Sequence, residues 1–376
     1  MKKPLSLDFS PVVWFKQQLK QKLIQTITLD ELNLPQPPRG AAPSEIIATP
    51  EAAILPFPPD KTDWQRTNYA SLTAKTVVIP EAIYIPEYNV VLSDRQEIIT
   101  DSFTPHKPKE EFKLSYLFAR PTKKISGCCT LIQQLSNNYY HHLVENLPRF
   151  YLSCRHPEIA NAKSVKLLYS EPIWDDFFLP RLMPPQVSLL KLEPGQNYRL
   201  EKLVLTTFMT QDGNGHFPQN VREEIYARFL PQRPPRPQHR IYISRAKAPL
   251  GRHLTNEAEL LEVLAPLKFK KYILEDIPFS QQIELFYDAR IVVAPHGAGL
   301  TNLLFGKQLQ ILELFSQPSI TTPHYYYLAK SIGHEYRYYC ANQPGCDRYS
   351  NFAAEIEEVR QLLQDWLAPQ SSISLL

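Results

Sequence analysis

A glycine-rich turn follows a buried strand between residues 290 and 302, which read Arg-Ile-Val-Val-Ala-Pro-His-Gly-Ala-Gly-Leu-Thr-Asn. Gly297 and Gly299 carry no side chain that would keep an anion away from the free N–H groups at the start of the next helix. Thr301 adds a hydroxyl donor, and His296 stands at the strand end, where it can hydrogen-bond a phosphate or a sugar hydroxyl. The order of strand, glycines and helix predicts a phosphate site, with a tight turn that binds nothing as the alternative.

Two arginines follow the first predicted strand of the same region. Arg245 ends the run Tyr-Ile-Ser-Arg, and Arg252 lies in the loop after it. Arginine chelates phosphate oxygens with two parallel hydrogen bonds and keeps its charge, so the pair favours a diphosphate; solvated loop arginines are the alternative. Glu313 lies among apolar residues of a later strand, where an acid needs hydrogen-bond partners. A ribose diol or a backbone group would supply them.

A second pair of polar residues has the spacing of a general base. His141 and Glu145 are four residues apart and therefore share one face of a predicted helix. A carboxylate beside an imidazole raises its basicity, as removal of a proton from a sugar hydroxyl requires. An ion pair on a polar helix face is an equal alternative, and a zinc site is disfavoured because a third ligand is absent. Asp212 and His216 lie in a polar glycine loop and compete for the same role, although the loop also reads as a simple turn.

These residues need two sets of strands and helices to position them. Short β-branched runs between residues 75 and 93 predict an antiparallel layer, and strands and helices alternate from residue 128 onward. After the proline-rich stretch 230–238, five strand–helix units in about 130 residues predict a doubly wound, mostly parallel sheet. The fold class is therefore α/β. The expected division is an N-terminal helix with proline-rich connectors at 1–64, an α/β domain at 65–236, and a Rossmann-like domain with a C-terminal helix at 237–376.

The composition excludes several classes of protein. Of 376 residues, 43% are hydrophobic and 21% are charged, which is ordinary globular usage and argues against disorder or a coiled coil. A net charge of +3 is too small for a protein built around nucleic acid. The 5 cysteines include no C-x-x-C pair, and no secretory signal is evident, so a reducing cytoplasm is expected.

Residues 10–27 predict an amphipathic helix with lysines away from its apolar face. Packing against a domain is one reading of this helix. The other is a peripheral contact with the anionic inner face of a membrane.

Three separate motifs together resemble glycosyltransferase family 61, whose bacterial members are often labelled capsular polysaccharide biosynthesis proteins. The motifs are Asn-Tyr-Tyr-His with Glu145 and Leu-Pro-Arg, Tyr-Ile-Ser-Arg with Arg252, and Ala-Pro-His-Gly-Ala-Gly-Leu-Thr-Asn with Glu313. The order and spacing match over about residues 125–340, and His142 departs from the aromatic residue common in the family. The resemblance implies a GT-B architecture, in which two Rossmann-like domains face each other across a cleft, and an inverting transfer that needs neither metal nor cofactor.

The expected function is a hexosyl- or pentosyltransferase that moves sugar from a nucleotide diphosphate, UDP first, to a glycan or glycolipid hydroxyl. A non-catalytic glycan-binding or scaffold subunit is the alternative from another class; an NAD(P)-dependent oxidoreductase is less favoured because the turn follows the third strand of its domain. His141, Glu145 and Asp212 are the catalytic candidates. The nucleotide-sugar-binding set comprises Arg245, Arg252, His296, Gly297, Ala298, Gly299, Thr301, Asn302 and Glu313.

Overall fold

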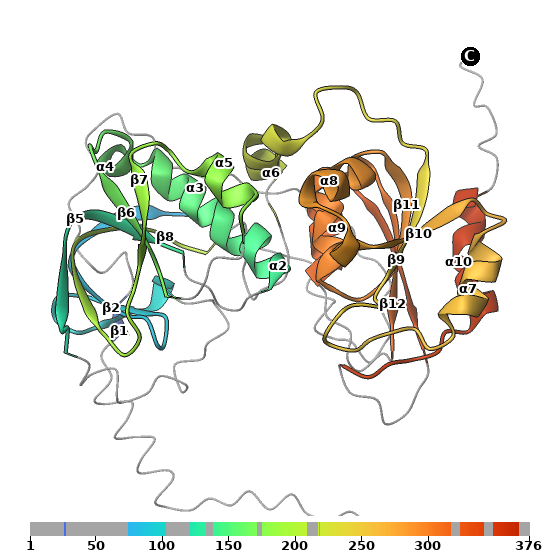
Figure 1. Ribbon diagram of the computed structural model, residues 1–376, viewed down its shortest axis with the longest axis horizontal. Helices are drawn as coiled ribbons and strands as arrows, with labels where there is room; N and C mark the ends of the chain where they lie inside the picture. Colours follow the sequence, from blue (N-terminus) through green and yellow to red (C-terminus); the bar gives the residue numbers. More distant parts are fainter. Residues whose placement is uncertain are drawn as a thin grey trace, which may run out of the picture. The chain divides into compact units, whose positions relative to one another are not determined.

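The computed structural model describes residues 26–27, 74–102, 120–132, 138–170, 175–208, 217, 219–316, 324–341 and 349–367. These residues form two compact units, each with its own sheet (Figure 1). The first unit takes its described residues from Met1–Glu45, of which only Thr26–Ile27 are described, and from Ala74–Asn137 and Glu145–Gly213. The second takes them from Asn138–Val144 and Asn214–Leu376. The predicted α/β class is confirmed in both units.

The first unit is built on a mixed sheet of eight strands in the order β1-β4-β3-β2-β8-β5-β6-β7. Parallel pairing joins β8, β5, β6 and β7, whereas β2 pairs antiparallel with both β8 and β3, as the short runs near residue 80 predict. The strands are β1 (Thr26–Ile27), β2 (Thr76–Ile85), β3 (Val90–Leu92), β4 (Ile98–Ile99), β5 (Lys123–Leu131), β6 (Val165–Tyr169), β7 (Val187–Lys191) and β8 (Tyr198–Thr206).

Helix α3 (Leu147–Arg155) packs against β8 and β5, and α4 (Pro157–Ala160) and α5 (Phe178–Leu182) pack beside it. Almost every residue of α3 is buried, because one side faces the sheet and the other faces neighbouring helices. Asp175 begins α5 by accepting hydrogen bonds from the backbone N–H groups of Phe177, Phe178 and Leu179. Its carboxylate thereby satisfies donors that the helix start leaves without partners.

The second unit contains five parallel strands in the order β10-β9-β11-β12-β13. They are β9 (His239–Ser244), β10 (Phe269–Ile273), β11 (Ala289–Pro295), β12 (Gln310–Phe315) and β13 (Glu335–Cys340). The central strands β11 and β12 are buried along nearly their whole length, as is typical of a parallel sheet covered on both faces.

Helices cover both faces of this second sheet (Figure 1). Helices α7 (Glu257–Leu264) and α10 (Ile356–Leu367) pack on one face, and α8 (Phe279–Tyr287), α9 (His324–Ser331) and the 3-10 helix η9 (Ala298–Phe305) pack together on the other. Tyr242, Ile291, Leu312 and Trp366 belong to the core between the sheet and α7 with α10. The doubly wound arrangement predicted from the strand–helix alternation is therefore present.

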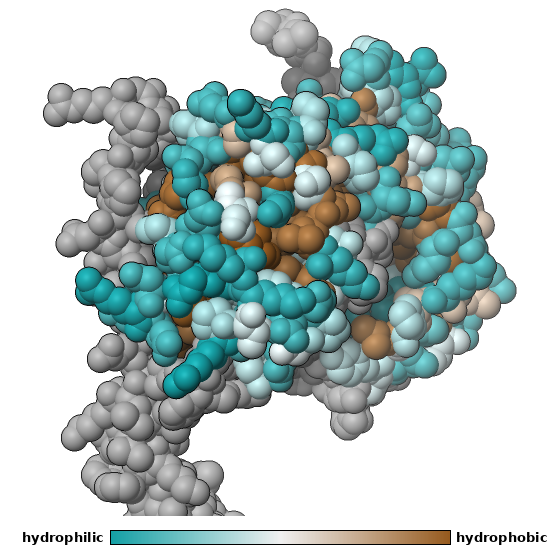
Figure 2. Space-filling view, turned by 60° about the vertical axis from the view of Figure 1, so that its left-hand side comes forward, coloured by the Kyte–Doolittle hydropathy of each residue, from teal (hydrophilic) through white to brown (hydrophobic). Residues whose placement is uncertain are grey.

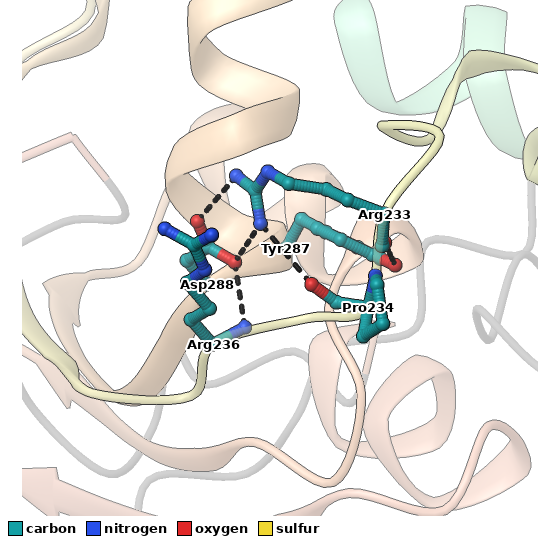
Figure 3. Close-up of polar contacts among 5 residues, drawn as sticks. All are labelled: Arg233, Pro234, Arg236, Tyr287 and Asp288. Atoms are coloured by element: carbon teal, nitrogen blue, oxygen red, sulfur yellow. Dashed lines mark hydrogen bonds and ion pairs between the residues drawn. The ribbon is translucent and has the colours of Figure 1, made fainter.

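The proline-rich stretch 230–238 is held to the end of α8 by a network of polar contacts (Figure 3). Arg233 donates to both carboxylate oxygens of Asp288, at 2.9 and 2.6 Å, and the backbone N–H of Arg236 donates to the same side chain at 2.8 Å. The hydroxyl of Tyr287 donates to the backbone carbonyl of Arg233. These contacts of the proline-rich stretch therefore lie inside the second unit.

On the face shown in Figure 2, hydrophilic side chains surround an area of hydrophobic ones. Among the described residues, Leu189, Leu250 and Tyr349 are large hydrophobic residues with exposed side chains. No helix in the described part of the chain is long and apolar enough to cross a membrane. The predicted helix at residues 10–27 lies outside the described residues, apart from the two residues of β1.

Candidate active site

The order of the strands in the second unit creates one point, between β9 and β11, where the connections from two neighbouring strands lead in opposite directions along the sheet. From β9 the chain moves outward to β10, and it then returns past β9 to β11 and continues in the opposite direction. Parallel sheets bind ligands at the carboxyl ends of the strands at such a switch point. Arg245 directly follows the end of β9, and His296 and Gly297 directly follow the end of β11. The predicted phosphate residues therefore meet where this fold forms binding sites.

Arg245 lies directly against the glycine turn. A Cβ atom on Gly297 would come within 1.9 Å of Nη1 of Arg245, so the missing side chain makes room for the guanidinium group. Nε of Arg245 donates to the carbonyl of Gly251 at 3.1 Å. Burial and the nearby Arg252 lower the pKa of Arg245 to about 10, which still leaves it charged at neutral pH. A positive charge is thus held over the start of η9.

The surrounding space is small. A cavity of about 40 Å³ is lined by residues of the β9 and β11 ends and by the turn, including Ser244, Arg245, Glu275, Gly297 and Gly299. Ligand pockets usually measure several hundred Å³. In this structure the cavity is therefore smaller than an ordinary ligand pocket.

His296 is fixed by a buried acid. Its Nδ1 lies 2.5 Å from Oε1 of Glu313, and its ring stacks on Phe315 and tilts against Tyr325. Glu313 is fully buried, and its other oxygen accepts the hydroxyl of Tyr336. The described partners of the Glu313 carboxylate are therefore the side chains of His296 and Tyr336.

Asn302 and Thr301 are fully buried. Nδ2 of Asn302 donates to Oε1 of Gln282 at 3.0 Å and to the carbonyl of Gly299 at 3.1 Å, while its Oδ1 accepts the hydroxyl of Tyr139 at 2.8 Å. Thr301 lies beside Tyr325. The structure thus places both residues beneath the turn, where they hold its shape. Ala298 and Gly299 remain partly exposed on the turn itself.

Residues 138–144 pack with the second unit, although Glu145–Gly213 of the first unit separate them in the sequence from Asn214–Leu376. Helix α2 (Tyr139–His141) begins at Asn138, whose side chain accepts the N–H of Tyr140. The ring of Tyr139 stacks on Phe279 at 5.6 Å, and the ring of Tyr140 meets Tyr325 edge-on at 5.6 Å. These tyrosines form part of the support of the glycine turn.

In a comparison with known protein families, residues 139–311 match the family model described as glycosyltransferase 61. These residues belong to glycosyltransferase family 61. No curated protein matches the chain. The region runs from Tyr139 through Arg245 and Arg252 to the glycine turn and the start of β12. Membership of this family supports glycosyltransferase activity, in which a sugar is in general taken from a nucleotide-sugar donor and passed to a glycan acceptor.

The family 61 region also contains the predicted His141–Glu145 pair, and its two members pack with different units. The ring of His141 contacts Tyr140 edge-on at 5.3 Å, and the side chain is only partly buried. Glu145 is buried near Arg149, whose pKa is lowered to about 9 by burial despite the opposing effect of that carboxylate. His141 ends α2, and Glu145 lies in the π-helical turn η5 (His142–Asn146) that follows it.

Arg149 lies with Glu145 in a buried polar cluster of the first unit. Its Nε donates to the carbonyl of Thr206 at 2.8 Å, and its guanidinium group lies 3.7 Å from the centre of the Phe208 ring. Asp212 and His216 lie outside the described residues. No group of three or more His, Cys, Asp or Glu in the described ranges is placed to hold a metal ion.

Sequence reasoning missed Tyr139, Tyr140, Tyr325 and Tyr336 as parts of the site. The first two belong to the Asn-Tyr-Tyr-His run, in which the sequence pattern predicted no role for the tyrosine rings. The last two lie in α9 and β13, beyond the glycine turn, where an aromatic residue in a helix or strand looks like any other core residue. Only the fold brings them to His296 and Glu313.

Proposed function

We propose that the second unit binds the diphosphate of a nucleotide-sugar, UDP-linked first, at the carboxyl ends of β9 and β11. The enzyme transfers the sugar to a hydroxyl of a glycan or glycolipid with inversion and without a metal. The observation that carries this proposal is the Arg245 guanidinium group, which lies against Gly297 at the start of η9. A cation, a helix start and a switch point coincide there.

In this reaction the arginines and the backbone N–H groups of the glycine turn stabilise the leaving anion. The acceptor oxygen forms a bond to the anomeric carbon as the bond from that carbon to the diphosphate oxygen breaks. The diphosphate leaves with the electron pair, and its charge is met by Arg245, Arg252 and the backbone N–H groups of the turn. Preorganised donors of this kind contribute about 3 kcal/mol each to the transition state. The two arginines then supply the positive charge that a divalent cation supplies in metal-dependent transferases.

The acceptor proton needs a base. His141 is the proposed base, with Glu145 as its orienting carboxylate and Asp212 as the competing base. The position of His141 in the segment that packs with the second unit supports this role. The buried surroundings of Glu145, close to Arg149, favour the simple alternative of a structural carboxylate for that residue.

The wider proposal follows the family. We propose a GT-B type of enzyme of capsular polysaccharide biosynthesis, placed in the cytoplasm with a peripheral contact at the inner face of the membrane through residues 10–27. Two α/β units with separate sheets are compatible with that type. The described residues of the site do not favour a hexose over a pentose as the transferred sugar.

The decisive experiment is a calorimetric binding panel of UDP, GDP, CDP, ADP, NAD and NADP with the full chain. We expect UDP to bind and Arg245→Ala to weaken its binding by about 30-fold or more, which corresponds to about 2 kcal/mol. Arg360→Ala is the matched control, because Arg360 donates to the carboxylate of Glu357, one turn before it on α10, and both side chains are exposed.

Binding of NAD alone would replace the transferase proposal by the oxidoreductase alternative. Failure of every nucleotide to bind, together with binding of a glycan, would favour a scaffold subunit. Unchanged UDP affinity in Arg245→Ala would show that the phosphate site is elsewhere.

A further inference from the structure

Two large hydrophobic side chains are exposed beside the arginines of the candidate donor site. Leu250 lies in the loop between Arg245 and Arg252, and Tyr349 lies in the segment that leads to α10. Their exposed fractions are 57% and 46%. Single exposed apolar residues are common on protein surfaces, but those grouped next to a polar site often belong to a binding surface. The position of the Tyr349 ring relative to the arginines decides whether it belongs to one.

A series of contacts leads from the glycine turn to the ring of Tyr349. Arg245, which lies against Gly297, donates from Nε to the backbone carbonyl of Gly251 at 3.1 Å. The next residue, Arg252, donates its backbone N–H to the carbonyl of Tyr349 at 3.1 Å. The guanidinium carbon of Arg252 lies 5.9 Å from the centre of the Tyr349 ring. Tyr349 thus lies directly beside an arginine of the proposed diphosphate site.

The backbone that carries Arg252 is held in a strained conformation. Gly251 and Arg252 have φ angles of +56° and +60°, a left-handed region that a residue with a Cβ atom seldom adopts. Two hydrogen bonds fix the chain directly after them: the N–H of His253 donates to Oδ1 of Asn351 at 3.0 Å, and the N–H of Phe352 donates to the carbonyl of His253 at 3.0 Å. Strain of this kind persists only where the surrounding structure enforces it, and it occurs often at ligand sites. The arginine and the segment before α10 are therefore held in a fixed relation.

The two arginines are close enough for their charges to interact. Burial and the positive charge of Arg252 lower the pKa of Arg245 to about 10. An anion bound between two like charges offsets their repulsion. A nucleotide carries such an anion at one end and an aromatic base at the other, with a ribose between them. The exposed aromatic ring beside Arg252 fits the second end.

We propose that the Tyr349 ring stacks on the base of the nucleoside diphosphate whose phosphates Arg245 and Arg252 bind. This inference rests on the proposed function, since it needs a nucleotide at the carboxyl ends of β9 and β11. It goes further by naming the residue that recognises the base. Every base has an aromatic face, so stacking on Tyr349 makes a nucleoside diphosphate bind more tightly than bare diphosphate without selecting uracil.

The test compares the binding of UDP and of inorganic diphosphate to the full chain by calorimetry. Removing an aromatic ring from under a base weakens binding about 5- to 150-fold, and we expect a loss in that range for UDP in Tyr349→Ala. Diphosphate, which has no base, should bind Tyr349→Ala and the wild type equally. Tyr349→Phe keeps the ring and should bind UDP as the wild type does. Leu189→Ala is the control, because Leu189 is 45% exposed and lies in the first unit.

A second measurement does not depend on affinity. Tyr349→Trp places an indole under the base, and stacking on a base quenches indole fluorescence. We expect UDP at saturation to quench the fluorescence of Tyr349→Trp more strongly than that of the wild type, and diphosphate to cause no such difference. The carbonyl that accepts the Arg252 N–H belongs to the backbone, so all of these variants keep that hydrogen bond and should keep the wild-type Tm.

The outcomes separate this inference from the proposal on which it rests. Arg245→Ala, which removes a phosphate contact, should weaken the binding of both ligands. Unchanged UDP affinity in Tyr349→Ala, or an equal loss for UDP and diphosphate, overturns base stacking and leaves the phosphate site standing. Weaker glycan binding with unchanged UDP affinity overturns it as well, because the ring would then contact the acceptor. If the wild type binds neither UDP nor diphosphate, the proposed function fails and this inference fails with it.

Discussion

The guanidinium group of Arg245 lies where a side chain on Gly297 would stand, with Nη1 only 1.9 Å from the position of a Cβ atom. The absence of a side chain at position 297 therefore makes room for the Arg245 guanidinium group and not only for a ligand. The relationship separates two kinds of glycine in the second unit. Some make room for a flexible side chain, and others adopt a backbone conformation that a Cβ atom disfavours.

Gly297→Ala tests the first kind. The atom it would meet is the end of a flexible side chain, so we expect the arginine to move and the free energy of unfolding to change by less than about 1 kcal/mol. UDP affinity should nevertheless fall about tenfold or more, because the guanidinium group loses its place. Urea denaturation and calorimetry measure the two effects.

Gly251→Ala is the contrasting variant. Gly251 has a φ angle of +56°, and a Cβ atom there would come within 2.0 Å of the backbone carbonyl of Tyr349. A left-handed conformation alone costs about 1–2 kcal/mol for a residue with a side chain. We expect Gly251→Ala to lose more stability than Gly297→Ala, and the reverse order would contradict this account of the turn.

Asn302→Ala should destabilise the second unit by about 3 kcal/mol. The change leaves Gln282, the carbonyl of Gly299 and the hydroxyl of Tyr139 without a buried partner, and unpaired buried groups are costly. Urea denaturation gives the value, with Gln219→Ala as a control, since that exposed side chain donates to Glu223 on the same helix. Wild-type stability in Asn302→Ala would mean that the amide does not hold the turn.

The Arg233–Asp288 pair predicts a dependence of stability on pH. Its hydrogen bonds hold the pKa of Asp288 below the ordinary value of 3.8. A carboxyl whose pKa is lower in the folded state stabilises the protein above its unfolded pKa, and this contribution disappears as the pH falls through the folded pKa.

We therefore expect Asp288→Asn to lower Tm at pH 6 and the difference from the wild type to shrink below about pH 4. Thermal unfolding across pH 3–7 measures it. Asp276→Asn is the control, because Asp276 pairs with Lys247 in an exposed position. A Tm difference that is the same at every pH would show that the effect of Asp288 is not ionic.

His141→Ala should lower the transfer rate by about 10² to 10⁴ while leaving UDP affinity nearly unchanged. A base acts on the acceptor proton and makes no contact with the nucleotide. Steady-state kinetics and calorimetry test both halves of the statement, with the exposed His239→Ala as control. A matching loss of nucleotide affinity would instead make His141 part of the support of the donor site.

The local elements of the second unit could be predicted because each is encoded by neighbouring residues. Apolar runs such as Ile291–Ala294 are long enough for a buried strand, and the glycines after them end it. The alternation of strands with helices then leaves few arrangements other than a parallel sheet. The meeting of Arg245 with Gly297 follows, since carboxyl ends of adjacent parallel strands share an edge.

The sequence by itself thus determined the α/β class, the glycine turn, the arginines beside it and the family. The tertiary structure decided which candidates face the site. Glu313, Thr301 and Asn302 are beneath it, because partners for them come from β13, α9 and α8, whose register and packing no spacing reveals. It also decided that Asn138–Val144 packs with the second unit while Glu145 packs with the first. A spacing of four residues predicts only that two side chains share one face of a helix. Which other elements that face packs against depends on contacts between residues far apart in the chain.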